Sequence, residues 1–162
     1  MPVIYIGIGS NVDPELHIRR AVSELRTQFG EVTCSPVYRT AAVGFAGNDF
    51  YNLVVKIETD LELQVIAAET RRIETLCGRH RQELKFGPRT IDLDILTYGE
   101  TVGTFAGFVV PRPDILKYSF VLGPLATLAP HARHPIVQRS YAELWHAHEM
   151  DSALTPVPDF LP

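Results

Sequence analysis

Two aspartates that stand one residue apart carry the clearest chemical signal in the chain. Residues 91–96 alternate apolar and polar side chains, which is typical of a β-strand with one buried face. Asp92 and Asp94 then project together from the face opposite the apolar row. Carboxylates this close repel each other, so the spacing favours a bound cation or a shared proton. Their hard oxygen ligands favour Mg²⁺, and an ordinary edge strand with a solvated polar face is the alternative.

A cluster of cationic side chains precedes this strand. It consists of Arg79, His80, Arg81, Lys85 and Arg89. Cations beside a carboxylate pair suit a polyphosphate, because phosphoryl transfer depends mainly on positioning and electrostatic stabilisation. The sequence has no Walker lysine motif, which excludes the common phosphate-binding loop. A merely solvated basic loop is the alternative interpretation.

The elements that must position these residues follow from hydrophobic spacing. We expect strands at residues 3–9, 31–40, 50–59 and 91–96, and helices at 13–30 and 60–78. The order strand, helix, strand, strand, helix, strand predicts an α+β protein with a ferredoxin-like βαββαβ core, in which both helices cover one face of an antiparallel sheet. Asp92, Asp94, Phe50 and Asn52 would then share the other face, which loops and a ligand would have to cover.

The C-terminal third is predicted to be an extension of this core. Short helices are expected at residues 120–128 and 141–149, and the proline-rich tail 151–162 is expected to be loosely ordered. The proline within the expected strand 31–40, Pro36, indicates an edge position or a bulge.

Composition limits the classes of protein that fit. A chain of 162 residues can bury a substantial core, and we expect one domain over residues 1–162. The formal net charge of −4 argues against a nucleic-acid partner. No apolar run is long enough to span a membrane, the N-terminus lacks the features of a secretory signal, and two cysteines imply no disulfide framework. We therefore expect a cytoplasmic protein that acts on small molecules, and we favour a monomer as its oligomeric state.

Other motifs carry less weight. The run Gly7–Asn11 follows a strand and precedes a helix, but it lacks the third glycine of a dinucleotide-binding fingerprint, so a tight turn is favoured. Histidine pairs at 131/134 and 146/148 have no cysteines nearby and are interpreted as surface or packing residues. Phe50 is more informative, because an aromatic ring on the open face suits stacking on a flat heterocycle.

Several longer motifs between Tyr5 and about Pro130 resemble the 6-hydroxymethyl-7,8-dihydropterin pyrophosphokinase family of folate biosynthesis. The motifs are Ile6–Asn11, Tyr38–Thr40 followed by Phe50–Asn52, Ile73-Glu74 leading to Gly78-Arg79, Phe86–Asp94, and Phe120–Leu122 with Pro124-Leu125. The resemblance implies a ferredoxin-like transferase that moves a pyrophosphoryl group from ATP to the hydroxymethyl group of the pterin and releases AMP. It also implies two Mg²⁺ ions, with Asp92 and Asp94 as their ligands.

The resemblance further assigns residues to the two substrates. Arg79 and Arg89 would be catalytic, clamping the phosphates, with Arg81 as a further contact in a closing loop. The implied nucleotide-binding residues are Arg71, Glu74, Arg79, Arg81, Arg89, Ile95, Arg112, Lys117 and Tyr118. The implied pterin-binding residues are Thr40, Ala41, Val43, Phe50, Asn52, Phe86, Asp92 and Phe120, with Phe50 and Phe120 sandwiching the ring.

The chain departs from the family pattern mainly on the nucleotide side. Arg112 stands where the family usually has histidine, Tyr118 where it has arginine, and Arg71 replaces a glutamine-like contact. A paralogue that binds pterin but uses ATP poorly is therefore the second interpretation. A different two-metal nucleotidyl enzyme on the same fold is the third.

Overall fold

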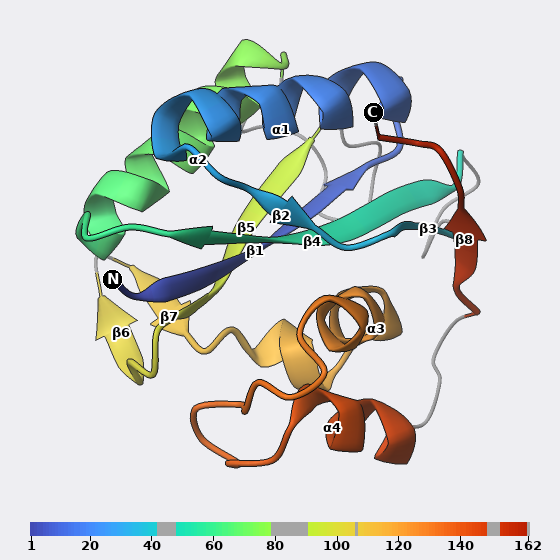
Figure 1. Cartoon of the computed structure of the whole chain (residues 1–162). Helices are drawn as coiled ribbons and strands as arrows, with labels where there is room; N and C mark the ends of the chain where they lie inside the picture. The colour runs from blue at the N-terminus through green and yellow to red at the C-terminus, as the bar shows by residue number, and fades with distance from the viewer. Residues whose placement is uncertain (42–47, 79–90, 106, 149–152, 162) are drawn as a thin grey trace.

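A central antiparallel sheet lies between two helical layers in the computed structural model, which describes residues 1–41, 48–78, 91–105, 107–148 and 153–161 (Figure 1). The sheet contains β1 (Val3–Ser10), β2 (Thr33–Cys34), β3 (Val37–Thr40), β4 (Phe50–Glu58), β5 (Asp92–Tyr98) and β8 (Thr155–Val157). Its order is β5-β1-β4-β3-β8, and β2 also pairs with β4. A separate hairpin joins β6 (Gly103–Phe105) to β7 (Phe108–Val110).

The helices divide between the two faces of the sheet. They are α1 (Pro14–Phe29), α2 (Leu63–Leu76), the short 3-10 helix η1 (Pro113–Leu116), α3 (Ser119–Leu128) and α4 (Tyr141–Ala147). Figure 1 shows α1 and α2 on one side of the sheet and α3 and α4 on the other. No helix within the described ranges has both the length and the apolar character needed to cross a membrane.

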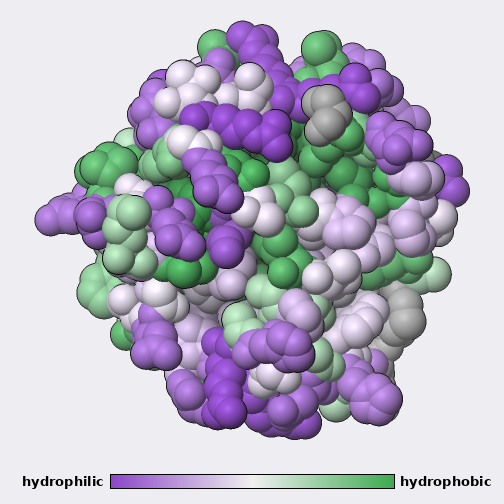
Figure 2. Space-filling view, in the orientation of Figure 1, coloured by the Kyte–Doolittle hydropathy of each residue, from purple (hydrophilic) through white to green (hydrophobic). Residues whose placement is uncertain are grey.

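The main core lies between the sheet and the pair α1 and α2. Leu93 and Ile95 of β5 are buried there, as the alternation of residues 91–96 predicted, so Asp92 and Asp94 point to the other face. The remaining fully buried members include Ile4, Ile6, Ile8, Ile18, Leu25, Leu53, Ile57, Ile66 and Ile73. In Figure 2 the hydrophobic residues that reach the surface gather mainly in a middle band, between the outer surfaces of the helical layers.

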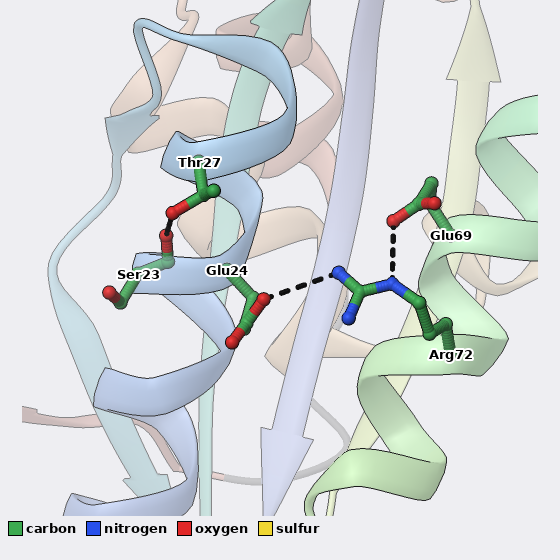
Figure 3. Close-up of polar contacts among 5 residues, drawn as sticks. All are labelled: Ser23, Glu24, Thr27, Glu69 and Arg72. Atoms are coloured by element: carbon green, nitrogen blue, oxygen red, sulfur yellow. Dashed lines mark hydrogen bonds and ion pairs between the residues drawn. The ribbon is translucent and has the colours of Figure 1, made fainter.

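A polar bridge links the solvent sides of α1 and α2 (Figure 3). The Arg72 guanidinium on α2 contacts Glu24 of α1 at 3.2 Å and Glu69 of its own helix at 2.9 Å. Beside it, the Thr27 hydroxyl donates to the Ser23 carbonyl at 3.1 Å. Because these groups are partly exposed to solvent, the bridge contributes little to stability.

The second face of the sheet corrects one expectation. We expected loops and a ligand to cover it, but α3 and α4 cover part of it instead. Tyr5, Val54 and Leu96 from the sheet form a second core, with Leu125 of α3 and Tyr141 of α4 among its buried members. Extra helices beyond the core pattern provide this cover, and the hollow that remains on this face lies beside them.

The strand expected at 31–40 is interrupted at Ser35-Pro36, which agrees with the expected edge or bulge. Proline has no N–H for the ladder, and Ser35 replaces part of the pairing. Its N–H donates to the Val54 carbonyl and its hydroxyl accepts from the Val54 N–H, both at 2.9 Å.

The tail also departs from its expectation, because residues 153–161 lie against the sheet. β8 pairs with β3, and Phe160 is buried with its ring stacked on Tyr51 at 5.5 Å between centroids. The Arg19 guanidinium on α1 donates to the Phe160 carbonyl at 2.9 Å. The tail is therefore a structural part of the sheet edge over the described residues.

Candidate active site

The floor of the hollow is a groove made by two glycines of β1. Gly9 pairs with Asn52 on one side and with Asp92 on the other, and Gly7 pairs in the same way with Val54 and Asp94. Directly paired residues share a face of the sheet. In each of these two rows of paired residues, a glycine therefore lies between two residues that have side chains on that face. The rows span two strand spacings, roughly 10 Å. The absence of Cβ atoms in the middle strand is what opens the groove.

The two candidate metal ligands form one wall of this groove. Asp92 and Asp94 are both partly exposed, line the cavity and lie two residues apart on β5, which separates their Cα atoms by roughly 7 Å. Among the described residues no group of three or more His, Cys, Asp or Glu side chains could hold a metal ion. A pair of carboxylates fits Mg²⁺ in particular, because this ion commonly takes one or two carboxylates and completes its shell with water and substrate phosphates.

The opposite wall comes from η1 and the start of α3. Arg112, Asp114, Tyr118, Phe120 and Val121 line the cavity from this side. The Arg112 guanidinium reaches across to the sheet. Its Nη2 lies 3.8 Å from Asp94 Oδ1, and its Nε lies 3.4 Å from Asp114 Oδ2. This wall therefore brings a cation into direct contact with one of the two candidate ligands.

One end of the cavity is aromatic and polar. Thr40, Ala41 and Phe50 lie where β3 ends and β4 begins, next to the buried Asn52. Phe120 enters from α3, and its ring stacks on Tyr118 at 5.0 Å with an angle of 19°. Flat rings together with a buried carboxamide suit a flat heterocycle with a polar edge.

The cavity joins these groups into one space of about 480 Å³, the size of a site for a small molecule. Nine of the residues expected at the site line it: Thr40, Ala41, Phe50, Asn52, Asp92, Asp94, Arg112, Tyr118 and Phe120. Asp92 and Asp94 thus lie on one wall, the Arg112–Asp114 pair lies opposite them, and aromatic rings lie at one end. This arrangement can hold a flat ring and a phosphate chain side by side.

Four expected nucleotide-side residues lie away from this cavity. Ile95 is 3% exposed, and its side chain is packed in the core against the helices, so only its backbone remains for a ligand. The Glu74 carboxylate on α2 accepts the Leu93 N–H at 2.9 Å, which ties α2 to β5. The Arg71 guanidinium lies 5.0 Å from the centre of the Phe108 ring, and the Lys117 side chain is exposed after η1.

Five expected site residues lie outside the described part of the chain. They are Val43, Arg79, Arg81, Phe86 and Arg89. The expected phosphate clamp of arginines and two of the expected pterin contacts therefore stay predictions.

Of the cavity-lining residues that the sequence did not predict, three bear on the shape and charge of the site. Gly7 and Gly9 were correctly expected within the strand 3–9, but they were given no role in the site, and they form the cavity floor. Alternate glycines in a strand are a usable signal, because such glycines often mark close approach of a ligand. Asp114 lines the cavity and contacts Arg112, and no local pattern distinguishes it from an ordinary residue at the start of a helix.

Comparisons with a family model and with individual proteins agree on one family. Residues 5–130 match the model of the family described as 7,8-dihydro-6-hydroxymethylpterin-pyrophosphokinase. A 2-amino-4-hydroxy-6-hydroxymethyldihydropteridine pyrophosphokinase of Aquifex aeolicus is 34% identical over 88% of this chain and 90% of its own length. The protein of the same name from Bacillus subtilis is 38% identical over 78% of this chain and 77% of its own length.

Solved structures agree at the level of the fold. A crystal structure of Plasmodium falciparum HPPK-DHPS superimposes with a TM-score of 0.71 over 91% of this chain at 13% identity. The present chain spans 43% of the length of that protein. The match supports the mixed α/β architecture with an antiparallel sheet.

Proposed function

The chain belongs to the 7,8-dihydro-6-hydroxymethylpterin-pyrophosphokinase family, and from this premise we propose that it transfers a pyrophosphoryl group from ATP to 6-hydroxymethyl-7,8-dihydropterin. The observation that carries the proposal is the groove, which places a carboxylate pair and an aromatic, carboxamide-lined end in one cavity. One end suits the flat pterin and the other suits the phosphates. Relatives named as pyrophosphokinases favour this function over the pterin-binding paralogue.

The residues of the groove would divide the work. The pterin ring would lie between Phe50 and Phe120, and the Asn52 carboxamide offers both a donor group and an acceptor oxygen to its polar edge. Asp92 and Asp94 would hold Mg²⁺, which supplies charge neutralisation for the polyphosphate when it is bound. Arg112 lies beside these carboxylates, within the same cavity.

The reaction balances as a displacement at phosphorus. The hydroxymethyl oxygen of the pterin attacks the β-phosphorus of ATP, and the bond from that phosphorus to the oxygen bridging it to the α-phosphorus breaks. AMP leaves with the bridging oxygen, and the hydroxyl proton is released to water. The groove contributes mainly by holding the two substrates in line, since orientation supplies much of the rate in such reactions. Arg79 and Arg89 are proposed to stabilise the charge on the transferred group, with Arg81 assisting.

We also propose a specific topology for the core of the fold. The strand order β5-β1-β4-β3, with α1 and α2 on one face, supports a ferredoxin-like core to which α3, α4 and β8 have been added.

Formation of AMP tests the proposed function. The full chain is incubated with ATP, Mg²⁺ and the hydroxymethyl dihydropterin, and AMP and pterin diphosphate are quantified by chromatography. We expect the two products in equal amounts, and no AMP when the pterin is omitted. A folded protein that makes no AMP at high ATP, or that makes AMP without the pterin, would contradict the proposal.

A further inference from the structure

Arg112 is held at the carboxylate pair by its own backbone. Its N–H donates to the Leu96 carbonyl of β5 at 2.7 Å, two residues from Asp94. Prolines flank it on both sides, and each proline ring restricts the backbone around the arginine. The backbone position from which this side chain extends is therefore set by the fold.

The guanidinium lies between two carboxylates. Nη2 is 3.8 Å from Asp94 Oδ1, and Nε is 3.4 Å from Asp114 Oδ2. Nε is buried and makes no hydrogen bond among the described residues. The arrangement is thus an electrostatic contact, with the arginine shared between a residue of the sheet and a residue of η1.

Such a cation must oppose a metal ion at the same carboxylate. A divalent ion on Asp94 would lie within a few ångströms of the guanidinium, and like charges at that separation repel in a partly buried site. Asp94 gains less from a metal ion when the arginine is already in place. Asp114 offers the displaced guanidinium a second partner, so displacement does not leave the arginine uncompensated.

We propose that Arg112 is an internal counter-ion of Asp94 that competes with the divalent cation and weakens binding of the metal alone. The inference rests on the proposed function, because it assumes that Asp92 and Asp94 form the metal site. Its consequence is that a free metal ion occupies the site poorly, and that a metal carried by a nucleotide polyphosphate is favoured, because the phosphates provide the displaced arginine with new anionic partners.

Binding of Mn²⁺ without nucleotide tests the inference. The affinities of the wild type, Arg112→Gln and Arg112→Lys are measured by electron paramagnetic resonance of free Mn²⁺. We expect Arg112→Gln to bind Mn²⁺ about 3- to 10-fold more tightly at low ionic strength, and Arg112→Lys, which keeps the charge, to stay near the wild type. The gain should shrink with added salt, because partly exposed charges are screened. Arg139→Gln is the matched control, since it removes an exposed arginine paired with Glu143 on α4.

The outcomes separate the inference from the function on which it rests. An affinity of Arg112→Gln equal to or weaker than that of the wild type would overturn the counter-ion role, as would absence of binding to either protein. Asp94→Asn is measured in parallel. If it binds Mn²⁺ as well as the wild type does, the metal site itself is wrong. If it loses binding while Arg112→Gln behaves like the wild type, only the inference fails.

Discussion

At the scale of single residues, the site depends on the absence of a side chain at Gly9. Gly9 leaves room for Asn52 on the neighbouring strand, because a Cβ at Gly9 would lie 2.6 Å from Asn52 Oδ1. That atom is the end of a side chain that can rotate, so an added methyl group would move the carboxamide while the strand stays in place. The glycine therefore controls the orientation of the proposed pterin contact.

We predict that Gly9→Ala weakens use of the pterin more than use of ATP. The displaced carboxamide loses its alignment with the heterocycle edge, so KM for the pterin should rise about tenfold or more, which corresponds to roughly 1.4 kcal/mol. Steady-state kinetics with each substrate varied in turn gives the comparison. In an Asn52→Ala background, Gly9→Ala should have little further effect on KM for the pterin. Equal losses for both substrates would contradict a role through Asn52.

The residues that could be predicted are those that obey a local rule. Alternation along 91–96 was enough to place Asp92 and Asp94 on one face, and the same rule correctly put Phe50 and Asn52 with them. Alternation also placed Ile95 on the buried face, which conflicts with a side-chain contact to the nucleotide, and the structure agrees with alternation. Asp114 could not be predicted as a site residue, because its place in the cavity depends on how η1 lies relative to the sheet.

At the scale of elements, the tail supports the strands that carry the pterin end. β8 pairs with β3, and Phe160 packs on Tyr51, the neighbour of Phe50 on β4. Proline-rich composition suggested loose order because local propensity gives no information about pairing with a strand more than 100 residues away. The βαββαβ order was readable from periodicity, whereas the packing of α3 and α4 on the second face was not.

We predict that Phe160→Ala lowers the free energy of unfolding by about 2–3 kcal/mol. This is somewhat less than for a ring in the centre of a core, because a chain end can relax. Urea denaturation measures the change, and Phe160→Leu, which retains most of the apolar volume, should cost less. A loss below about 0.5 kcal/mol for the alanine variant would show that the tail does not stabilise the sheet edge.

At the scale of the whole molecule, the second core joins the C-terminal helices to the sheet, and a buried histidine packs against its member Tyr141. His134 is 2% exposed, and its Nδ1 accepts from the Ile136 N–H at 3.1 Å and from the Val137 N–H at 3.3 Å. Its ring lies edge-on to Tyr141, 6.4 Å between centroids. Burial lowers the pKa of His134, because a charged ring would be poorly solvated there.

We predict that this histidine makes stability depend on pH. Because its pKa is lower in the folded state than the unfolded value of about 6.5, the unfolded chain binds the proton more readily. The stabilisation is fully present above about pH 6.5 and is lost as pH falls below that value toward the folded pKa. Urea denaturation at pH 7.5, 6.5 and 5.5 should show a steeper loss for the wild type than for His134→Asn, which retains an acceptor. If the stability of both proteins depends on pH in the same way, His134 is not the source of the pH dependence.

The proposed chemistry lies on the second face of the sheet, and substitution of the carboxylate pair tests this most directly. AMP formation with ATP, Mg²⁺ and the hydroxymethyl dihydropterin is compared for the wild type, Asp92→Asn and Asp94→Asn, with circular dichroism and thermal unfolding as controls of folding. Asp60→Asn, at a side chain that is 80% exposed, is the matched control. We expect each groove variant to lose at least about 100-fold in kcat/KM while it remains folded, and Asp60→Asn to behave like the wild type. Full activity in either folded groove variant would contradict the account.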